Sequence, residues 1–189
     1  MGNIKIYSFV IALFTVLLFT NELNAQKFER LDKNPHDIVY YRIGKMGLPQ
    51  VKVVYGRPEA KDQKVFGTQV PYGKIWRTGS EESTEIKFYQ DVMFGNKFVK
   101  AGTYVLYTIP NENYWTIILN KKTDTYGSCF YNPEDDIAKL EVPTVKGEMM
   151  ESFSIGFKRQ DYGSQMVLAW ATTRVHIPLY TESRLISKI

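Results

Sequence analysis

Short runs in which apolar and polar residues alternate recur along most of this chain, and they limit its fold more than any other feature. The runs are rich in β-branched and aromatic residues and are bounded by Gly, Pro, Asn or Asp, as strands joined by tight turns are. The clearest are TEIKFY (84–89), YVLYTI (104–109), WTIIL (115–119), FSIGF (153–157) and MVLAW (166–170). Farther on, Val175, Ile177 and Leu179 share one face, which predicts a half-buried antiparallel strand.

Turn signals between these runs support the same interpretation. Gly95-Asn96 predicts a two-residue hairpin turn, and 111–113 predicts a three-residue hairpin loop. No long window carries the stripe of apolar residues that a helix needs. We therefore predict an all-β chain that forms a single antiparallel β-sandwich, jelly-roll-like, with roughly ten short strands. This single domain is expected to span 26–189.

Residues 1–25 differ from the rest and are predicted to be a signal peptide. Lys5 precedes a fourteen-residue apolar stretch, 6–19, which suits the central region of a signal peptide. A bilayer span needs about 20 such residues, so an uncleaved anchor is the weaker alternative. Because Ala25 ends an acceptable cleavage site, we expect cleavage before Gln26 and a periplasmic or secreted protein without a transmembrane span.

Composition narrows the function classes. The 24 Lys and Arg against 20 Asp and Glu give a net charge of +4, spread along the chain, so we expect no nucleic-acid partner. The single cysteine, Cys129, excludes an internal disulfide and a cysteine-ligated structural zinc, and two histidines exclude a three-histidine metal site, which leaves only a mixed site with carboxylates open. Nucleotide, serine-hydrolase and metalloprotease motifs are also missing. We therefore expect no metal, no cofactor and, on balance, no enzyme; oligomeric state is left open.

One long segment, 55–82, carries little alternation and is the candidate ligand-binding region. Arg can fork a carboxylate or phosphate, and Trp can offer a stacking face to a glycan or a small organic anion. The candidate set, which includes two residues from outside the segment, is Arg57, Lys74, Trp76, Arg77, Glu82, Asp37 and Tyr126. An alternative interpretation is structural: Ile75 or Trp76 fills the core and Arg77 pairs with Glu82 to hold the loop.

Several phrases of the chain resemble the family of secreted proteins known as domain of unknown function 2911. They are PHDIVYYR (35–42), YGRP (55–58), PYGKIWRTG (71–79), AGTYVLYTIP (101–110), YGSCFYNPEDD (126–136) and LAWATTRVHIP (168–178). The chain departs from the usual pattern at Glu81, where the family has Asn, and at Tyr126, where it has Trp.

The resemblance implies a β-rich, signal-bearing envelope or secreted protein of Gram-negative bacteria without an established activity. Some relatives carry the label asparagine synthetase B. That chemistry needs an ATP-binding domain and an N-terminal cysteine nucleophile, and this chain has neither.

Two functions follow as hypotheses. The first is a non-catalytic ligand-binding or structural module of the cell envelope that uses the Arg57 to Arg77 region as its contact surface. The alternative is a hydrolase or isomerase acting on envelope carbohydrate, with Glu82, Asp37 or the pair Asp135/Asp136 brought together by folding.

Overall fold

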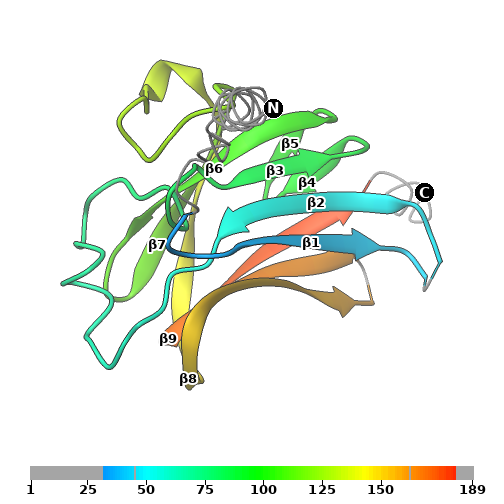
Figure 1. The fold of residues 1–189 in the computed structure, drawn as a ribbon. Helices are drawn as coiled ribbons and strands as arrows, with labels where there is room; N and C mark the ends of the chain where they lie inside the picture. The colour runs from blue at the N-terminus through cyan, green and yellow to red at the C-terminus, as the bar shows by residue number, and fades with distance from the viewer. Residues whose placement is uncertain (1–31, 45, 162, 182–189) are drawn as a thin grey trace, which may run out of the picture. The chain divides into compact units, whose positions relative to one another are not determined.

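The computed structural model describes residues 32–44, 46–161 and 163–181 and shows an all-β chain (Figure 1). The strands are β1 (His36–Arg42), β2 (Pro49–Gly56), β3 (Glu85–Phe88), β4 (Val92–Phe94), β5 (Lys97–Val99), β6 (Gly102–Pro110), β7 (Tyr114–Asn120), β8 (Asp136–Gln160) and β9 (Gly163–Thr181). A single 3-10 turn, η1 (Pro133–Asp135), precedes β8. Among these described residues, no helix is long and apolar enough to cross a membrane. The predicted signal peptide, 1–25, lies outside them.

All nine strands belong to one antiparallel sheet, in the order β1-β2-β3-β6-β7-β8-β9-β4-β5, which is not closed into a barrel. The long strand β8 joins the two halves of the sheet. It pairs with β7 up to Pro143 and with β9 from Thr144 onward, and it curves strongly along its length (Figure 1). The all-β, antiparallel prediction is thus confirmed.

The two halves of the sheet pack their inner faces against each other, as the layers of a sandwich do. Aromatic pairs join them: Tyr41 of β1 meets Phe157 of β8 with 5.6 Å between ring centroids, and Tyr55 of β2 meets Phe153 at the same distance. Phe88 of β3 meets Phe94 of β4 at 6.3 Å. One hydrophobic core therefore holds both halves together.

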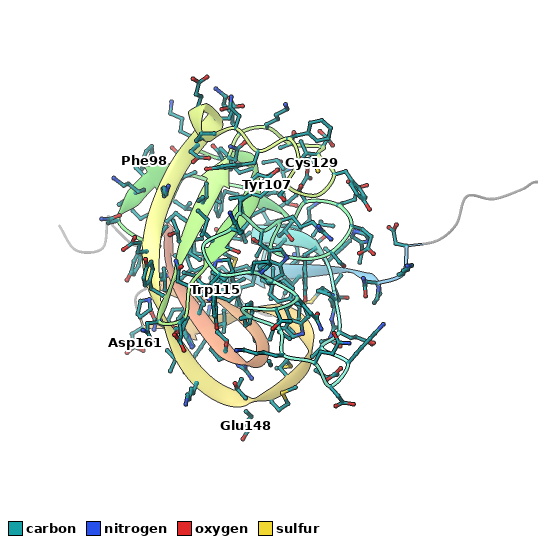
Figure 2. All side chains as sticks on the ribbon, turned by 90° about the vertical axis from the view of Figure 1, so that its left-hand side faces the viewer. Phe98, Tyr107, Trp115, Cys129, Glu148 and Asp161 are labelled. Carbon is teal, nitrogen blue, oxygen red and sulfur yellow. The ribbon has the colours of Figure 1, made fainter. Side chains whose placement is uncertain are left out.

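Two of the nine strands are longer than expected, since β8 has 25 residues and β9 has 19. The predicted runs 166–170 and 174–179 are parts of one strand, β9. Between them Ala171 has a φ of 47°, and the register with β8 shifts on both sides of Met150. Such irregularities bend a strand without ending its pairing, which explains why the sequence pattern divides it. Figure 2 shows Glu148 at the bend of β8 and Trp115 in the interior.

Candidate functional site

The later part of the irregular segment, around Trp76, continues the sheet along β6, beyond the point where β3 begins. Pairing of β3 with β6 stops at Glu85 and Val105. Past that point, the Leu106 N–H donates to the Thr84 carbonyl at 2.8 Å. Trp76 and Thr108 exchange two backbone hydrogen bonds of 2.7 and 2.9 Å. Because side chains alternate along an extended backbone, Trp76 faces the core and both of its neighbours face the other side.

Trp76 lies in the core. Its side chain is 9% exposed, and its ring packs against Phe66, Trp115, Phe153 and Trp170 with centroid distances between 5.1 and 6.2 Å. Its indole N–H donates to the Gly79 carbonyl at 3.0 Å. Trp76 therefore presents no open ring face to a ligand, and its position is that of the structural alternative, in which it fills the core.

The turn over 78–81 is held tightly against the end of β2. A Cβ atom at Gly56 would stand 2.2 Å from the Ser80 carbonyl oxygen, so only glycine fits there. Inside the turn, the buried Thr84 hydroxyl donates to the Thr78 carbonyl at 2.8 Å, although Thr78 itself has a positive φ of 59°. The segments YGRP (55–58) and WRTG (76–79) therefore pack closely against each other. This close approach explains why glycine occupies positions 56 and 79.

Arg77 points away from the core and has no partner among the described residues. Its side chain is half-buried, and the guanidinium makes no hydrogen bond or ion pair with any described residue. Its Nε is buried, and Glu82 is not within ion-pair distance, so the Arg77–Glu82 clamp is not formed. The guanidinium lies beside Gly127, where an added Cβ would be 3.9 Å from Nη1. Partly buried donors without acceptors are costly, which makes this group ready for an anionic oxygen.

Glu82 and Tyr126 pair with each other next to Gly127, the residue that Arg77 approaches. They are partners in an antiparallel bridge, so their side chains share one face. Two hydrogen bonds hold the bridge in place, from the Ser83 N–H to the Thr125 carbonyl at 3.0 Å and from the Gly127 N–H to the Glu81 carbonyl at 3.1 Å. The Tyr126 side chain is 57% exposed. Three of the predicted residues, Arg77, Glu82 and Tyr126, therefore gather around Gly127, and we call this set the Arg77 patch.

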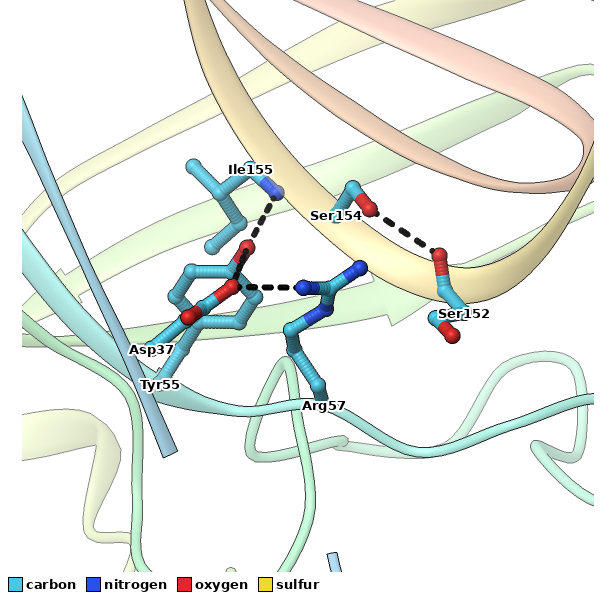
Figure 3. A network of polar contacts seen from close by, with 6 residues as sticks. All are labelled: Asp37, Tyr55, Arg57, Ser152, Ser154 and Ile155. Carbon is cyan, nitrogen blue, oxygen red and sulfur yellow. Dashed lines mark hydrogen bonds and ion pairs between the residues drawn. The ribbon is translucent and has the colours of Figure 1, made fainter. Parts of the chain in front are cut away.

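Asp37 and Arg57 form a second group, together with Tyr55 (Figure 3). Arg57 Nη1 donates to Asp37 Oδ2 at 2.8 Å, and the Tyr55 hydroxyl approaches the same oxygen at 3.5 Å. That hydroxyl accepts the backbone N–H of Ile155 at 3.1 Å. Burial, more than the nearby charges, raises the pKa of Tyr55. The Nε of Arg57 is buried without a partner, like that of Arg77.

The two groups are connected through Asn34, which no sequence pattern indicates. Its side-chain amide donates to both carboxylate oxygens of Glu81, at 3.1 and 3.2 Å, and the next residue, Pro35, accepts the Arg57 N–H at 2.9 Å. Gly127 is also missing from the prediction, and its only signal is its place after Tyr126 in YGSCF. Lys74 lies apart, on an exposed turn that is tied to Pro110 by a 2.9 Å hydrogen bond from Gly73.

The other carboxylates that the sequence singles out hold the chain in place. Asp135 pairs with Lys121 at 3.1 Å, and Asp136 accepts hydrogen bonds from Asn120 at 2.9 Å and from Tyr131 at 2.8 Å. Over the ranges that the structure describes, no group of three or more His, Cys, Asp or Glu side chains could hold a metal ion. A groove of about 670 Å³ lies elsewhere, between the β4–β5 turn, the start of β8 and the end of β9, and none of the predicted residues lines it.

Comparison with known proteins gives one match. A family model described as a protein of unknown function (DUF2911) matches residues 34–179. No curated protein and no solved structure matches the chain. The matched range contains every residue of the two groups described above.

Proposed function

The chain belongs to the DUF2911 family of proteins of unknown function, and from that premise we propose that it is an exported module that binds a small organic anion or an acidic sugar at the Arg77 patch without transforming it. The observation that carries the proposal is the half-buried Arg77 guanidinium without any acceptor in the described chain. Elsewhere in the molecule the comparable Arg57 has a carboxylate partner, Asp37.

Hydrogen bonds between the Arg77 guanidinium and a ligand carboxylate can supply enough free energy for measurable binding. A hydrogen bond to a charged group contributes about 1.5 to 3 kcal/mol, and a planar guanidinium can make two such bonds to one carboxylate or phosphate. Every 1.4 kcal/mol corresponds to about a tenfold change in affinity. Two such bonds from Arg77 to one ligand carboxylate would therefore account for a dissociation constant between several millimolar and some tens of micromolar, on the order of 10⁻³ to 10⁻⁵ M.

The neighbours of Arg77 favour a ligand that carries hydroxyl groups beside its acid. Tyr126 offers an exposed phenol and ring, and Glu82 offers a carboxylate that accepts hydrogen bonds. A ligand with carbon-borne hydroxyls can donate hydrogen bonds to this carboxylate, which sulfate cannot do. These groups therefore suit a sugar acid or a hydroxy acid better than sulfate.

Binding is tested by calorimetry and thermal shift with a panel of hexuronic acids, hydroxy acids and neutral sugars. Arg77→Ala should weaken binding of the acid at least about tenfold, and Arg77→Lys should recover only part of it because an ammonium lacks the planar fork. Lys74→Ala, which removes an exposed cation that lies apart from the Arg77 patch, is the matched control and should bind normally. Equal affinity of Arg77→Ala and the parent chain would refute the proposal.

Export rests on the sequence of residues 1–25 alone, and it has a separate test. Expression of the full chain in a Gram-negative host, followed by fractionation and N-terminal sequencing, should find a mature chain that begins at Gln26 in the periplasm or the medium. A full-length chain in the membrane fraction would instead indicate an uncleaved anchor.

The alternative function, carboxylate-dependent hydrolysis or isomerisation of a carbohydrate, has no observation in its favour. Asp37 is bound to Arg57, and Asp135 and Asp136 are bound to Lys121 and Tyr131. No contact brings any of these three carboxylates to Glu82.

A further inference from the structure

The outer face of β1, β2 and β3 carries a row of residues that pair directly across the strands. Tyr40 of β1 stands opposite Lys52 of β2, Lys52 stands opposite Lys87 of β3, and Lys87 stands opposite Thr103 of β6. Residues paired in this way project from the same face, at about 4.8 Å from strand to strand. We call Tyr40, Lys52, Lys87 and Thr103 the outer row.

Two lysines at the centre of this row form a pair of like charges. Like charges directly opposite each other on an antiparallel pair are destabilising. Neither Lys52 nor Lys87 has a carboxylate within ion-pair distance in the described chain. Glu85, which shares this face of β3 with Lys87, accepts the backbone N–H of Asp124 at 3.0 Å. Neither lysine therefore forms an ion pair that would offset their repulsion within the described residues.

Two exposed tyrosines and a third cation flank the lysine pair. The side chains of Tyr40 and Tyr89 are both 42% exposed. The Arg42 guanidinium lies 4.8 Å from the centroid of the Tyr40 ring, and the Lys87 ammonium lies 4.9 Å from that of Tyr89. Arg42, Lys52 and Lys87 thus stand against the single carboxylate of Glu85 on a face that is open to solvent.

We propose that this face binds an extended acidic polysaccharide, whose carboxylates lie over Lys52 and Lys87 and whose sugar rings contact Tyr40 and Tyr89. Charge complementarity carries the proposal, because a polymer carboxylate placed between the two ammonium groups relieves their repulsion. A row across four strands is long enough to contact successive sugar units. The proposal goes beyond the Arg77 patch and uses none of its residues.

The rings favour a polysaccharide over a single-stranded nucleic acid. Bases bind to proteins by stacking on an open aromatic face. Here a cation already covers one face of each ring, which leaves less open ring face for a base, whereas the phenolic hydroxyls can form hydrogen bonds with sugar hydroxyls. The test must therefore distinguish binding of a polysaccharide from binding of nucleic acid or anionic lipid.

The decisive variant is Lys52→Glu, because it changes stability and binding in opposite directions. It places opposite charges across the row, so the melting temperature should rise by roughly 1 to 3 °C. Affinity for polygalacturonate, a uronic-acid polymer, should fall at least about tenfold at low salt. Lys158→Glu on β8 is the control with the same change of charge and should bind within about twofold of the parent chain.

The binding assay uses polygalacturonate, uncharged dextran, single-stranded DNA and phosphatidylglycerol vesicles. We expect salt-sensitive binding of polygalacturonate, no binding of dextran, and unchanged polymer binding by Arg77→Ala. The inference is overturned if Lys52→Glu and Lys158→Glu bind the polymer equally, or if DNA or vesicles bind more tightly than the polymer. Loss of polymer binding in Arg77→Ala alone would assign it to the Arg77 patch and overturn the inference as well.

Discussion

Arg57 and Arg77 flank one turn of the chain but differ in what their guanidinium groups contact. Arg57 reaches the carboxylate of Asp37, whereas Arg77 reaches no acceptor in the described chain. Half-buried donors without partners lower the stability of the folded state. A residue that is retained at such a cost is typical of a binding site, where function and stability compete.

Replacing Arg77 by Met tests this contrast. The substitution keeps the length of the side chain but removes its charge and its unpaired donors, so the free energy of unfolding should stay unchanged or rise by up to about 1 kcal/mol. Arg57→Met removes a partly exposed ion pair and should lower it by up to about 1 kcal/mol. Urea denaturation measures both. A larger loss for Arg77→Met than for Arg57→Met would support the structural clamp instead.

Tyr55 and Tyr131 make stability depend on pH in the alkaline range. Burial raises the pKa of both, and for Tyr131 the hydrogen bond to Asp136 raises it further. Above pH 10 the unfolded chain loses these protons while the folded chain keeps them. The stabilising contribution is therefore complete below pH 10 and is lost as the pH rises, at about 1.4 kcal/mol per pH unit for each group at most.

Denaturant midpoints measured between pH 9 and 11 check this expectation. Tyr131→Phe should start from a lower midpoint, because Asp136 loses a hydrogen-bond donor, and should then fall less steeply with pH than the parent chain. Parallel curves for the two proteins would contradict it.

At the scale of elements, the segment 57–84 proves to be built into the sheet. Backbone hydrogen bonds with Thr108 and Leu106 continue the edge of β6, and Ala60, Val65, Phe66 and Val70 join the core. The sequence shows an irregular stretch because these contacts are made by isolated bridges and tight turns. Such structures do not require apolar and polar residues to alternate. The composition of the segment nevertheless singles out Arg77, whose guanidinium has no acceptor among the described residues.

The close approach between Gly56 and the Ser80 turn is the most sensitive point of this element. Gly56→Ala would force a Cβ against the Ser80 carbonyl at 2.2 Å, so we expect the free energy of unfolding to fall by about 1 to 3 kcal/mol. Gly156→Ala in β8 meets nothing within 4 Å and is the matched control, with little change or a small gain. Guanidinium denaturation of both variants gives the comparison; equal midpoints would show that the turn can move.

At the scale of the whole molecule, one aromatic cluster connects the irregular segment to both halves of the sheet. The three tryptophans of the chain, Trp76, Trp115 and Trp170, all belong to it, together with Phe66 and Phe153. These rings come from the segment, β7, β8 and β9. Tryptophan fluorescence should therefore report unfolding of the entire core in a single transition.

Trp76→Ala tests whether this residue is structural. Truncation of a buried tryptophan costs about 3 to 5 kcal/mol, so the variant should unfold at much lower denaturant concentration than Arg77→Ala. Circular dichroism and fluorescence would follow both variants. If Trp76→Ala has normal stability but fails to bind the acid, Trp76 would belong to the ligand site.

The sequence by itself determined the all-β class, the antiparallel pairing and the region of the candidate site, because alternation and turn residues act over a few neighbouring positions. Only the tertiary structure decided that β8 and β9 are single long strands, that Trp76 is buried, and that Arg77, Glu82 and Tyr126 meet around Gly127. It also decided that Lys52 stands opposite Lys87. Register and packing join residues far apart in the chain, and no local pattern records which partners the folded backbone brings together.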